Sequence, residues 1–79
     1  MKKEDEIKLI SIFQETFKIE DHEYIKSLKR ENYLKWDSLA VVSIIASISN
    51  SFSIEIDPND FEFFISYELI RSYIEKKIY

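Results

Sequence analysis

Residues 34–42, LKWDSLAVV, place an acidic and a hydroxyl side chain directly before a run of apolar residues. Asp37 suits the N-cap of a helix because its carboxylate can accept a hydrogen bond from a free backbone N–H of the first turn. Apolar side chains then recur at helical spacing. The stretch predicts a helix that begins at Ser38 and ends at about Asn50 or Ser51, with Asn50 terminating it in the left-handed conformation.

The composition limits the classes to which this chain can belong. Its 79 residues suffice for one domain, residues 1–79, and the 12 aromatic residues can fill one small core. The absence of cysteine excludes disulfides and thiolate metal sites. The absence of glycine argues against loops that cradle phosphates. With no signal-peptide pattern and no apolar run of ~18 residues, we expect a cytoplasmic monomer that does not insert into membranes.

The charge is unevenly distributed along the chain. Residues 1–36 contain eight acids and eight bases, whereas residues 37–79 contain seven acids and three bases, which gives the net charge of −4. A nucleic-acid-binding face requires the opposite sign, so this class is excluded. The acidic half favours partners with basic surfaces.

Helical spacing also marks the segments on either side of this stretch. Residues 3–17 predict a first helix, with acidic residues in its first turn. Residues 18–36 predict a long ordered loop with room for one short helical turn. The pair Asp57-Pro58 predicts a short third helix over 58–64, after an extended connector over 53–56.

A last helix is predicted to follow Ser66 as its N-cap, with four side chains directed inward: Leu69, Ile70, Tyr73 and Ile74. The fold class is therefore all-α, a four-helix bundle of three longer helices and one short third helix. In the short helix we expect Phe61 and Phe64 to face inward and Phe63 outward. Trp36 is expected to pack over the start of the second long helix.

The chain lacks the groups that an enzyme would need. A nucleophilic Ser38 requires a base and an oxyanion hole, and the only histidine, His22, lies between Asp21 and Glu23 in the long loop. We therefore predict no catalytic residue. Glu20 and its acidic neighbours lack the spacing of a calcium loop, so we predict no metal site.

Two interpretations of Ser38 remain open on chemistry alone. In the first, Asp37 and Ser38 together only cap the helix. In the second, Asp37 caps the helix by itself and the Ser38 hydroxyl is free for modification. The first helical position favours an anion, because the free N–H groups and the helix dipole are positive there.

The order of motifs resembles the acyl carrier protein family over nearly the whole chain. The shared features are Trp36-Asp37-Ser38-Leu39, an apolar helix up to Phe52, the segment Ile54-Glu55-Ile56, and acidic residues before a last helix. Trp before Asp-Ser-Leu is similar to stand-alone carriers of secondary-metabolite or surface-glycan pathways. The resemblance implies an acyl-carrier-like helical bundle with a long loop between helices one and two.

The resemblance also implies a prosthetic group and a set of site residues. A phosphopantetheinyl transferase would attach 4′-phosphopantetheine from coenzyme A to Ser38, and the arm's thiol would carry an acyl group as a thioester. Asp37 would engage the transferase, and Leu39 would pack at the base of the arm. Candidates for lining an acyl cleft, each equally suited to the core, are Val42, Ile45, Ala46, Phe52, Ile54, Ile56 and Phe64.

The chain departs from the family in its second long helix, which lacks the usual exposed acids. We therefore expect acyl- or aminoacyl-loading and transferring enzymes to dock more on the third helix, and less through charge, than is usual for the family. The candidate docking residues are Asp57, Asp60, Glu62 and Phe63. Two alternatives stay open. The chain is an aminoacyl or peptidyl carrier in one, and a small acidic helical adaptor without a prosthetic group in the other.

Overall fold

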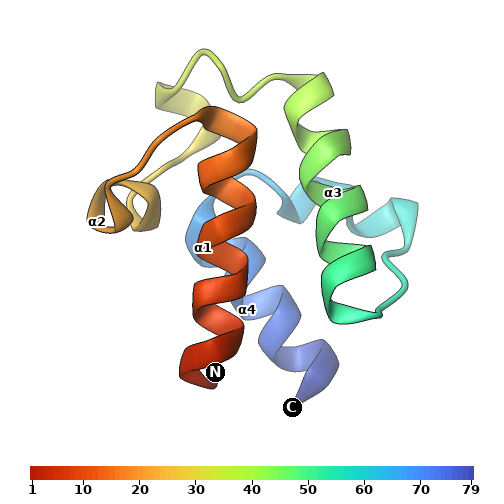
Figure 1. Cartoon of the computed structure of the whole chain (residues 1–79). Helices are drawn as coiled ribbons and strands as arrows, with labels where there is room; N and C mark the ends of the chain where they lie inside the picture. The colour runs from red at the N-terminus through yellow and green to blue at the C-terminus, as the bar shows by residue number, and fades with distance from the viewer.

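Helices account for every regular element of the chain, and the computed structural model describes all residues, 1–79. The elements are α1 (Lys3–Phe17), α2 (His22–Lys26), the 3₁₀ helix η1 (Arg30–Asn32), α3 (Ser38–Phe52), the 3₁₀ helix η2 (Pro58–Phe63) and α4 (Tyr67–Ile78). The all-α class is thereby confirmed. With dimensions of 29 × 28 × 17 Å the molecule is flat. In Figure 1, α1 and α3 lie side by side and α4 runs behind them.

The helix α1 has the predicted bounds. Three acidic side chains occupy its first turn, where the helix dipole stabilises them, and Lys18 follows its last residue in the left-handed conformation, with φ 59°. Its buried face points to the core, although Ile7 at the edge of the apolar stripe stays 50% exposed. The buried residues of α1 are Leu9, Ile10, Ile12, Phe13 and Phe17.

The segment 18–36 is more regular than the predicted loop. It forms both α2 and η1, whereas the sequence suggested room for one turn. Asp21 caps α2, because its carboxylate accepts the backbone N–H groups of Glu23 and Tyr24. Ile25 and Leu28 are buried and fasten the segment to the core.

The cap predicted for α3 is confirmed, since the Asp37 carboxylate accepts the N–H of Ala40 over 2.9 Å. The predicted end is wrong. Asn50 lies within the helix, and Ser53 adopts the left-handed conformation instead, with φ 54°. Ser49 explains the extension: its carbonyl accepts the N–H groups of Ser53 and Ile54, and its hydroxyl donates to the carbonyl of Ile54. These bonds, together with the packing of Phe52 against the core, outweigh the local preference of Asn50.

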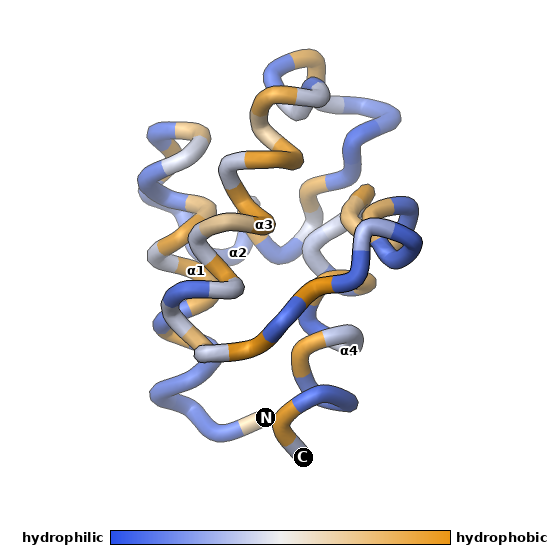
Figure 2. Tube along the Cα trace, turned by 90° about the vertical axis from the view of Figure 1, so that its right-hand side faces the viewer, coloured by the Kyte–Doolittle hydropathy of each residue, from blue (hydrophilic) through white to orange (hydrophobic).

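The connector after α3 has no regular structure, and its first predicted residue, Ser53, is left-handed rather than extended. It alternates apolar and polar residues in Figure 2, where the tube crosses towards η2 in alternating orange and blue. Ile54 and Ile56 pack against the core from this segment. The connector therefore covers one side of the core with every second side chain.

The short third helix is a 3₁₀ helix, and it ends at Phe63 rather than Phe64. Asp57 caps it as predicted, accepting the N–H of Asn59 over 2.8 Å. Phe63 points outward as predicted and is 43% exposed. The expectation that Phe61 faces inward is wrong, because Phe61 is 36% exposed. Phe64 leaves the helical conformation, so its fully buried ring no longer shares a face with Phe61.

The cap of α4 is confirmed, since the Ser66 hydroxyl accepts the N–H of Leu69 over 3.1 Å. Ile70 and Ile74 are fully buried and Tyr73 is partly buried. Leu69 differs from the prediction and remains 42% exposed. Tyr67 takes the inward place, because it lies on the same helix face as Ile70 and Ile74.

An aromatic cluster forms the centre of the core. The ring centroid of Phe13 lies 5.5 Å from that of Trp36 and 5.4 Å from that of Tyr67, both edge to face. Phe17 contacts Trp36 from the next turn of α1. Trp36 is 2% exposed, and the aromatic rings that contact it belong to α1, while α3 begins two residues after it.

Candidate functional site

Ser38 is the first residue of α3, and its side chain is exposed. Asp37 alone provides the cap, so the serine hydroxyl is not used to close the helix end. The hydroxyl has one polar contact: Nη2 of Arg30 donates a hydrogen bond of 3.3 Å to Oγ of Ser38. Ser38 is therefore accessible and lies beside a positive charge.

Arg30 is placed by backbone contacts to the segment before α4. Its N–H donates to the carbonyl of Ile65 over 2.8 Å, and Lys29 forms an isolated antiparallel bridge with Ser66. On the other side of the bridge, the N–H of Tyr67 donates to the carbonyl of Leu28 over 3.1 Å. The start of η1 is thus fastened to the α4 side of the molecule.

Trp36 fixes the other end of the same segment. Its ring is buried against Phe13 and Phe17, and its backbone N–H donates to the carbonyl of Tyr33 over 3.0 Å. Ser38 follows two residues later. Both ends of the segment are thus anchored through their backbone or a buried ring, which holds the backbone of Arg30 and Ser38 in place.

The guanidinium of Arg30 is not neutralised by a carboxylate. The four ion pairs of the structure involve the N-terminus, Lys26 and Arg71, and none involves Arg30. This charge beside Ser38 was not expected from the sequence, because residues 36–70 contain no lysine or arginine. The fold supplies it from the preceding loop, eight residues before Ser38.

Exposed aliphatic side chains flank Ser38 in the sequence. Leu34 is 100% exposed, Leu39 is 80% exposed, and Val42, one turn further, is 58% exposed. Leu39, predicted for the base of the arm, is thus free of contacts with the core. Ser38 thus has one cation beside its hydroxyl and exposed aliphatic residues near it in the sequence.

The residues suggested for an acyl cleft do not line one common cavity. Ile45 and Phe64 belong to the buried core, whereas Val42 and Ala46 are exposed on α3. Three others are partly buried against the core: Phe52, Ile54 and Ile56. Of the seven, only Ile56 lines any pocket, and that pocket is lined mainly by polar and charged residues.

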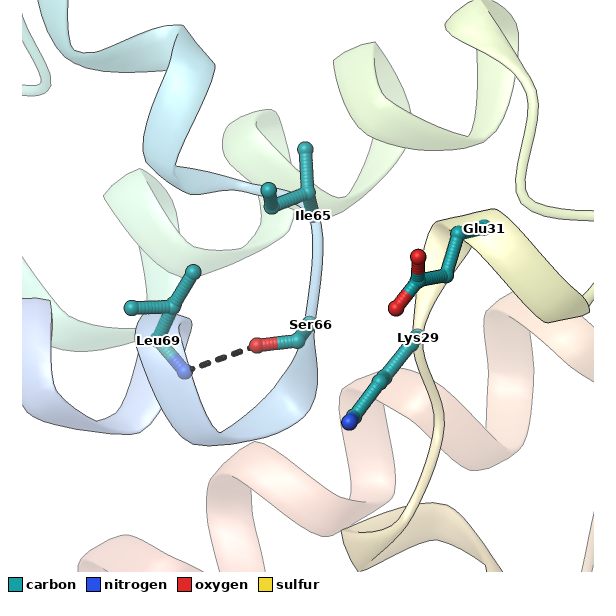
Figure 3. A pocket seen from close by; sticks show the side chains of 5 residues that line it. All are labelled: Lys29, Glu31, Ile65, Ser66 and Leu69. Atoms are coloured by element: carbon teal, nitrogen blue, oxygen red, sulfur yellow. Dashed lines mark hydrogen bonds between the residues drawn. The ribbon is translucent and has the colours of Figure 1, made fainter.

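A pocket of about 350 Å³ lies next to Arg30. Lys29 and Glu31, the two neighbours of Arg30 in sequence, face Ile65 and Leu69 across it (Figure 3). Ser66 also lines the pocket, and its hydroxyl accepts the backbone N–H of Leu69 in the cap hydrogen bond drawn there. The pocket therefore joins one apolar side to one charged side.

The predicted docking residues differ in whether their side chains already have a partner within the protein. The Asp57 carboxylate is used as a cap. Asp60 accepts the hydroxyl of Tyr73 over 2.7 Å, and burial together with this bond raises the pKa of Tyr73 to about 12. Glu62 and Phe63 are exposed, and Phe63 lines a second pocket with Leu69 and Tyr73. Glu62 is therefore the free acid of η2.

The remaining polar candidates do not gather into a site. His22 is exposed at the start of α2, and Asp21 is used in the α2 cap. No group of three or more histidine, cysteine or acidic side chains comes together that could hold a metal ion. None of the helices has both the length and the apolar character that crossing a membrane requires.

Comparison with known proteins adds no assignment: no family model, no curated protein and no solved structure matches the chain. The functional proposal below therefore depends on the motif and on the geometry around Ser38.

Proposed function

We propose that this protein is an acyl carrier protein that bears a 4′-phosphopantetheine arm on Ser38. The observation that carries the proposal is the state of the serine hydroxyl. The hydroxyl is exposed at the first position of α3, and Asp37 caps the helix without it. The guanidinium of Arg30, which has no carboxylate partner, lies beside it. An attached phosphodiester would find a cation there.

The order of elements supports an acyl-carrier-like bundle. A long α1 is followed by a long connection, the motif helix α3, a short acidic η2 and the closing helix α4. The Trp-Asp-Ser-Leu motif occupies the junction between the connection and α3. The arm supplies the thiol that carries the cargo, and the chain supplies the attachment atom and the surfaces that partners bind.

Each residue around the motif has a role in this proposal. Ser38 is the attachment point, and Asp37 fixes the helix end and engages a phosphopantetheinyl transferase. Leu39, exposed beside the attachment point, contacts the base of the arm. Glu62 and Phe63 are presented on η2 to partner enzymes with basic docking surfaces.

An aminoacyl or peptidyl carrier is the second candidate. The observation that favours it is the filled interior: Phe64 and Ile45, two of the expected cleft residues, are buried in the core, and the seven do not line a cavity. A short or polar cargo needs no apolar shelter. Competition between acyl and aminoacyl loading enzymes for the purified holo protein separates the two candidates.

The decisive experiment is incubation with coenzyme A and a permissive phosphopantetheinyl transferase, followed by intact-mass measurement. We expect the gain of one arm in the wild type and no gain in Ser38→Ala. Ser43→Ala is the matched control, because Ser43 is an exposed serine of the same helix. No gain in the wild type, while a control carrier is loaded, would contradict the proposal and favour the adaptor.

A further inference from the structure

We propose that Arg30 binds the phosphodiester of the Ser38-linked arm and fixes the base of the arm on the η1 side of α3. The inference rests on the proposed function and extends it to a residue outside the Asp-Ser-Leu motif. It starts from one contact, the hydrogen bond of 3.3 Å from Nη2 of Arg30 to Oγ of Ser38.

The donor geometry suits a phosphodiester better than it suits a hydroxyl. A guanidinium has five N–H donors in a planar fork, and it binds two oxygens of a phosphate at once. In the structure the Ser38 hydroxyl is the only side-chain partner of Arg30. A phosphorus atom bonded to Oγ would bring its two non-bridging oxygens next to the donors that have no partner.

The local charges favour this contact. Asp37 is adjacent to Ser38, so a phosphodiester on Ser38 places a second negative charge beside its carboxylate. The Asp37 carboxylate is already engaged with the N–H of Ala40. No ion pair removes Arg30 from the site, and its charge can therefore offset the two anions.

The position of Arg30 is prepared before any arm is attached. The bridge of Lys29 with Ser66 and the bond from Arg30 N–H to Ile65 hold its backbone in place. Only the side chain remains to be ordered on binding, which lowers the entropic cost. The arm would then begin beside the pocket of Lys29, Glu31, Ile65, Ser66 and Leu69 shown in Figure 3.

The test compares apo and holo forms of the wild type and three variants by ³¹P NMR and by ¹⁵N signals of arginine side chains. Arg30→Gln removes the charge, Arg30→Lys keeps the charge without the fork, and Lys35→Gln is the matched control. Lys35 is exposed in the same segment and has no polar contact with Ser38. Urea unfolding of the apo forms verifies that the variants fold.

In the wild type we expect attachment of the arm to shift the Arg30 Nε signal and to slow its exchange with water. Relative to the wild type, the ³¹P chemical shift should move towards that of a free phosphodiester in Arg30→Gln and should move less in Arg30→Lys. In Lys35→Gln it should equal the wild-type value. At low salt, the folding equilibrium constant of the wild-type holo form should be roughly fivefold larger than that of the Arg30→Gln holo form. A fivefold difference is the upper end for an exposed charge pair.

Three outcomes overturn the inference, and mass measurement distinguishes the first two. If the wild type gains the arm but its ³¹P signal equals that of Arg30→Gln, Arg30 does not bind the phosphodiester, while the carrier function stands. If the wild type gains no arm, the proposed function fails and the inference fails with it. If Lys35→Gln displaces the ³¹P signal as much as Arg30→Gln does, the phosphodiester responds to the overall positive charge of the segment, and the specific contact with Arg30 is overturned.

Discussion

Nε of Arg71 lies 2.8 Å from a carboxylate oxygen of Glu6, and this ion pair joins α4 to the first turn of α1. Glu75 is a second, more distant partner of the same guanidinium, at 3.8 Å. The hydrogen bond to Arg71 holds the pKa of the Glu6 carboxyl below its ordinary value of 4.5. The pair therefore links the two ends of the chain, where the N-terminus also contacts Glu75.

We predict that Glu6→Gln lowers the free energy of unfolding at neutral pH by about 0.5–1 kcal/mol, the range of a partly exposed ion pair. Because the folded-state pKa of Glu6 is lowered, its contribution is complete above pH 4.5 and is lost as the pH falls through the lowered pKa. Urea unfolding at several pH values measures this. Glu15→Gln, an exposed residue of α1 without an ion pair, is the control. A difference that persists in strong acid would contradict the prediction.

Ser66→Ala should destabilise the protein by about 1 kcal/mol, the usual cost of losing a helix N-cap. The Ser66 hydroxyl accepts the N–H of Leu69, and the residue is 8% exposed, so water cannot readily replace it. Ser72→Ala in the exposed middle of α4 is the control and should be neutral or slightly stabilising. Equal urea midpoints for both variants would show that the cap contributes nothing.

The two caps show what could be predicted from the sequence and why. Asp37 and Ser66 act within their own first turn, so a short stretch of sequence contains everything that decides their role. The end of α3 depends instead on how its last turn packs against Ile54 and the core, and the preference of Asn50 was overridden there. Phe61 was misplaced for a similar reason, because a 3₁₀ helix and the turn at Phe64 replaced the expected helical spacing.

The same distinction applies to the candidate site. Ser38 could be proposed from the sequence because its motif is continuous. Arg30 was not found, because its placement depends on the pairing of Lys29 with Ser66, which are distant in sequence. No spacing rule connects Arg30 with Ser38, and only the folded backbone brings them together.

Tyr73→Phe should cost about 1 kcal/mol, because it removes the hydrogen bond of 2.7 Å from the tyrosine hydroxyl to the Asp60 carboxylate. This bond is a link between α4 and η2, and Asp60 would keep its charge in a partly buried position without that partner. Urea unfolding gives the free energy, and amide hydrogen exchange in η2 should accelerate. Tyr24→Phe is the control, since its exposed hydroxyl has no partner in the structure. Unchanged exchange in η2 would contradict the link.

Tyr67→Phe removes a tyrosine hydroxyl that, unlike that of Tyr73, donates no hydrogen bond. The Tyr67 hydroxyl is buried without a hydrogen-bond partner, and burial, followed by the charge of Glu6, raises its pKa far above the ordinary value. Removing an unpartnered buried hydroxyl relieves its desolvation cost and leaves the packing of the ring on Phe13 intact. We expect the free energy of unfolding to stay the same or to rise by up to about 1 kcal/mol. A loss as large as that of Tyr73→Phe would reveal a partner for this hydroxyl.

Glu62→Lys should weaken docking of the transferase and of loading enzymes without changing stability. Glu62 is exposed and has no ion pair, whereas the neighbouring Asp60 is occupied by Tyr73. If partners present basic surfaces to η2, reversing this charge should raise KM by about two- to fivefold at low salt, as expected for an exposed charge pair. The increase should shrink at high salt, because the interaction is screened.

Glu15→Lys on α1 is the control for the change in net charge and should leave KM unchanged. Phe63→Ser, which removes the exposed ring next to Glu62, should raise KM at both salt concentrations, since an apolar contact is not screened. If Glu62→Lys and Glu15→Lys raise KM equally, partners respond to total charge and η2 is not the docking surface. If neither Glu62→Lys nor Phe63→Ser changes KM, partners bind elsewhere, and the exposed face of α3 around Leu39 and Val42 becomes the surface to mutate.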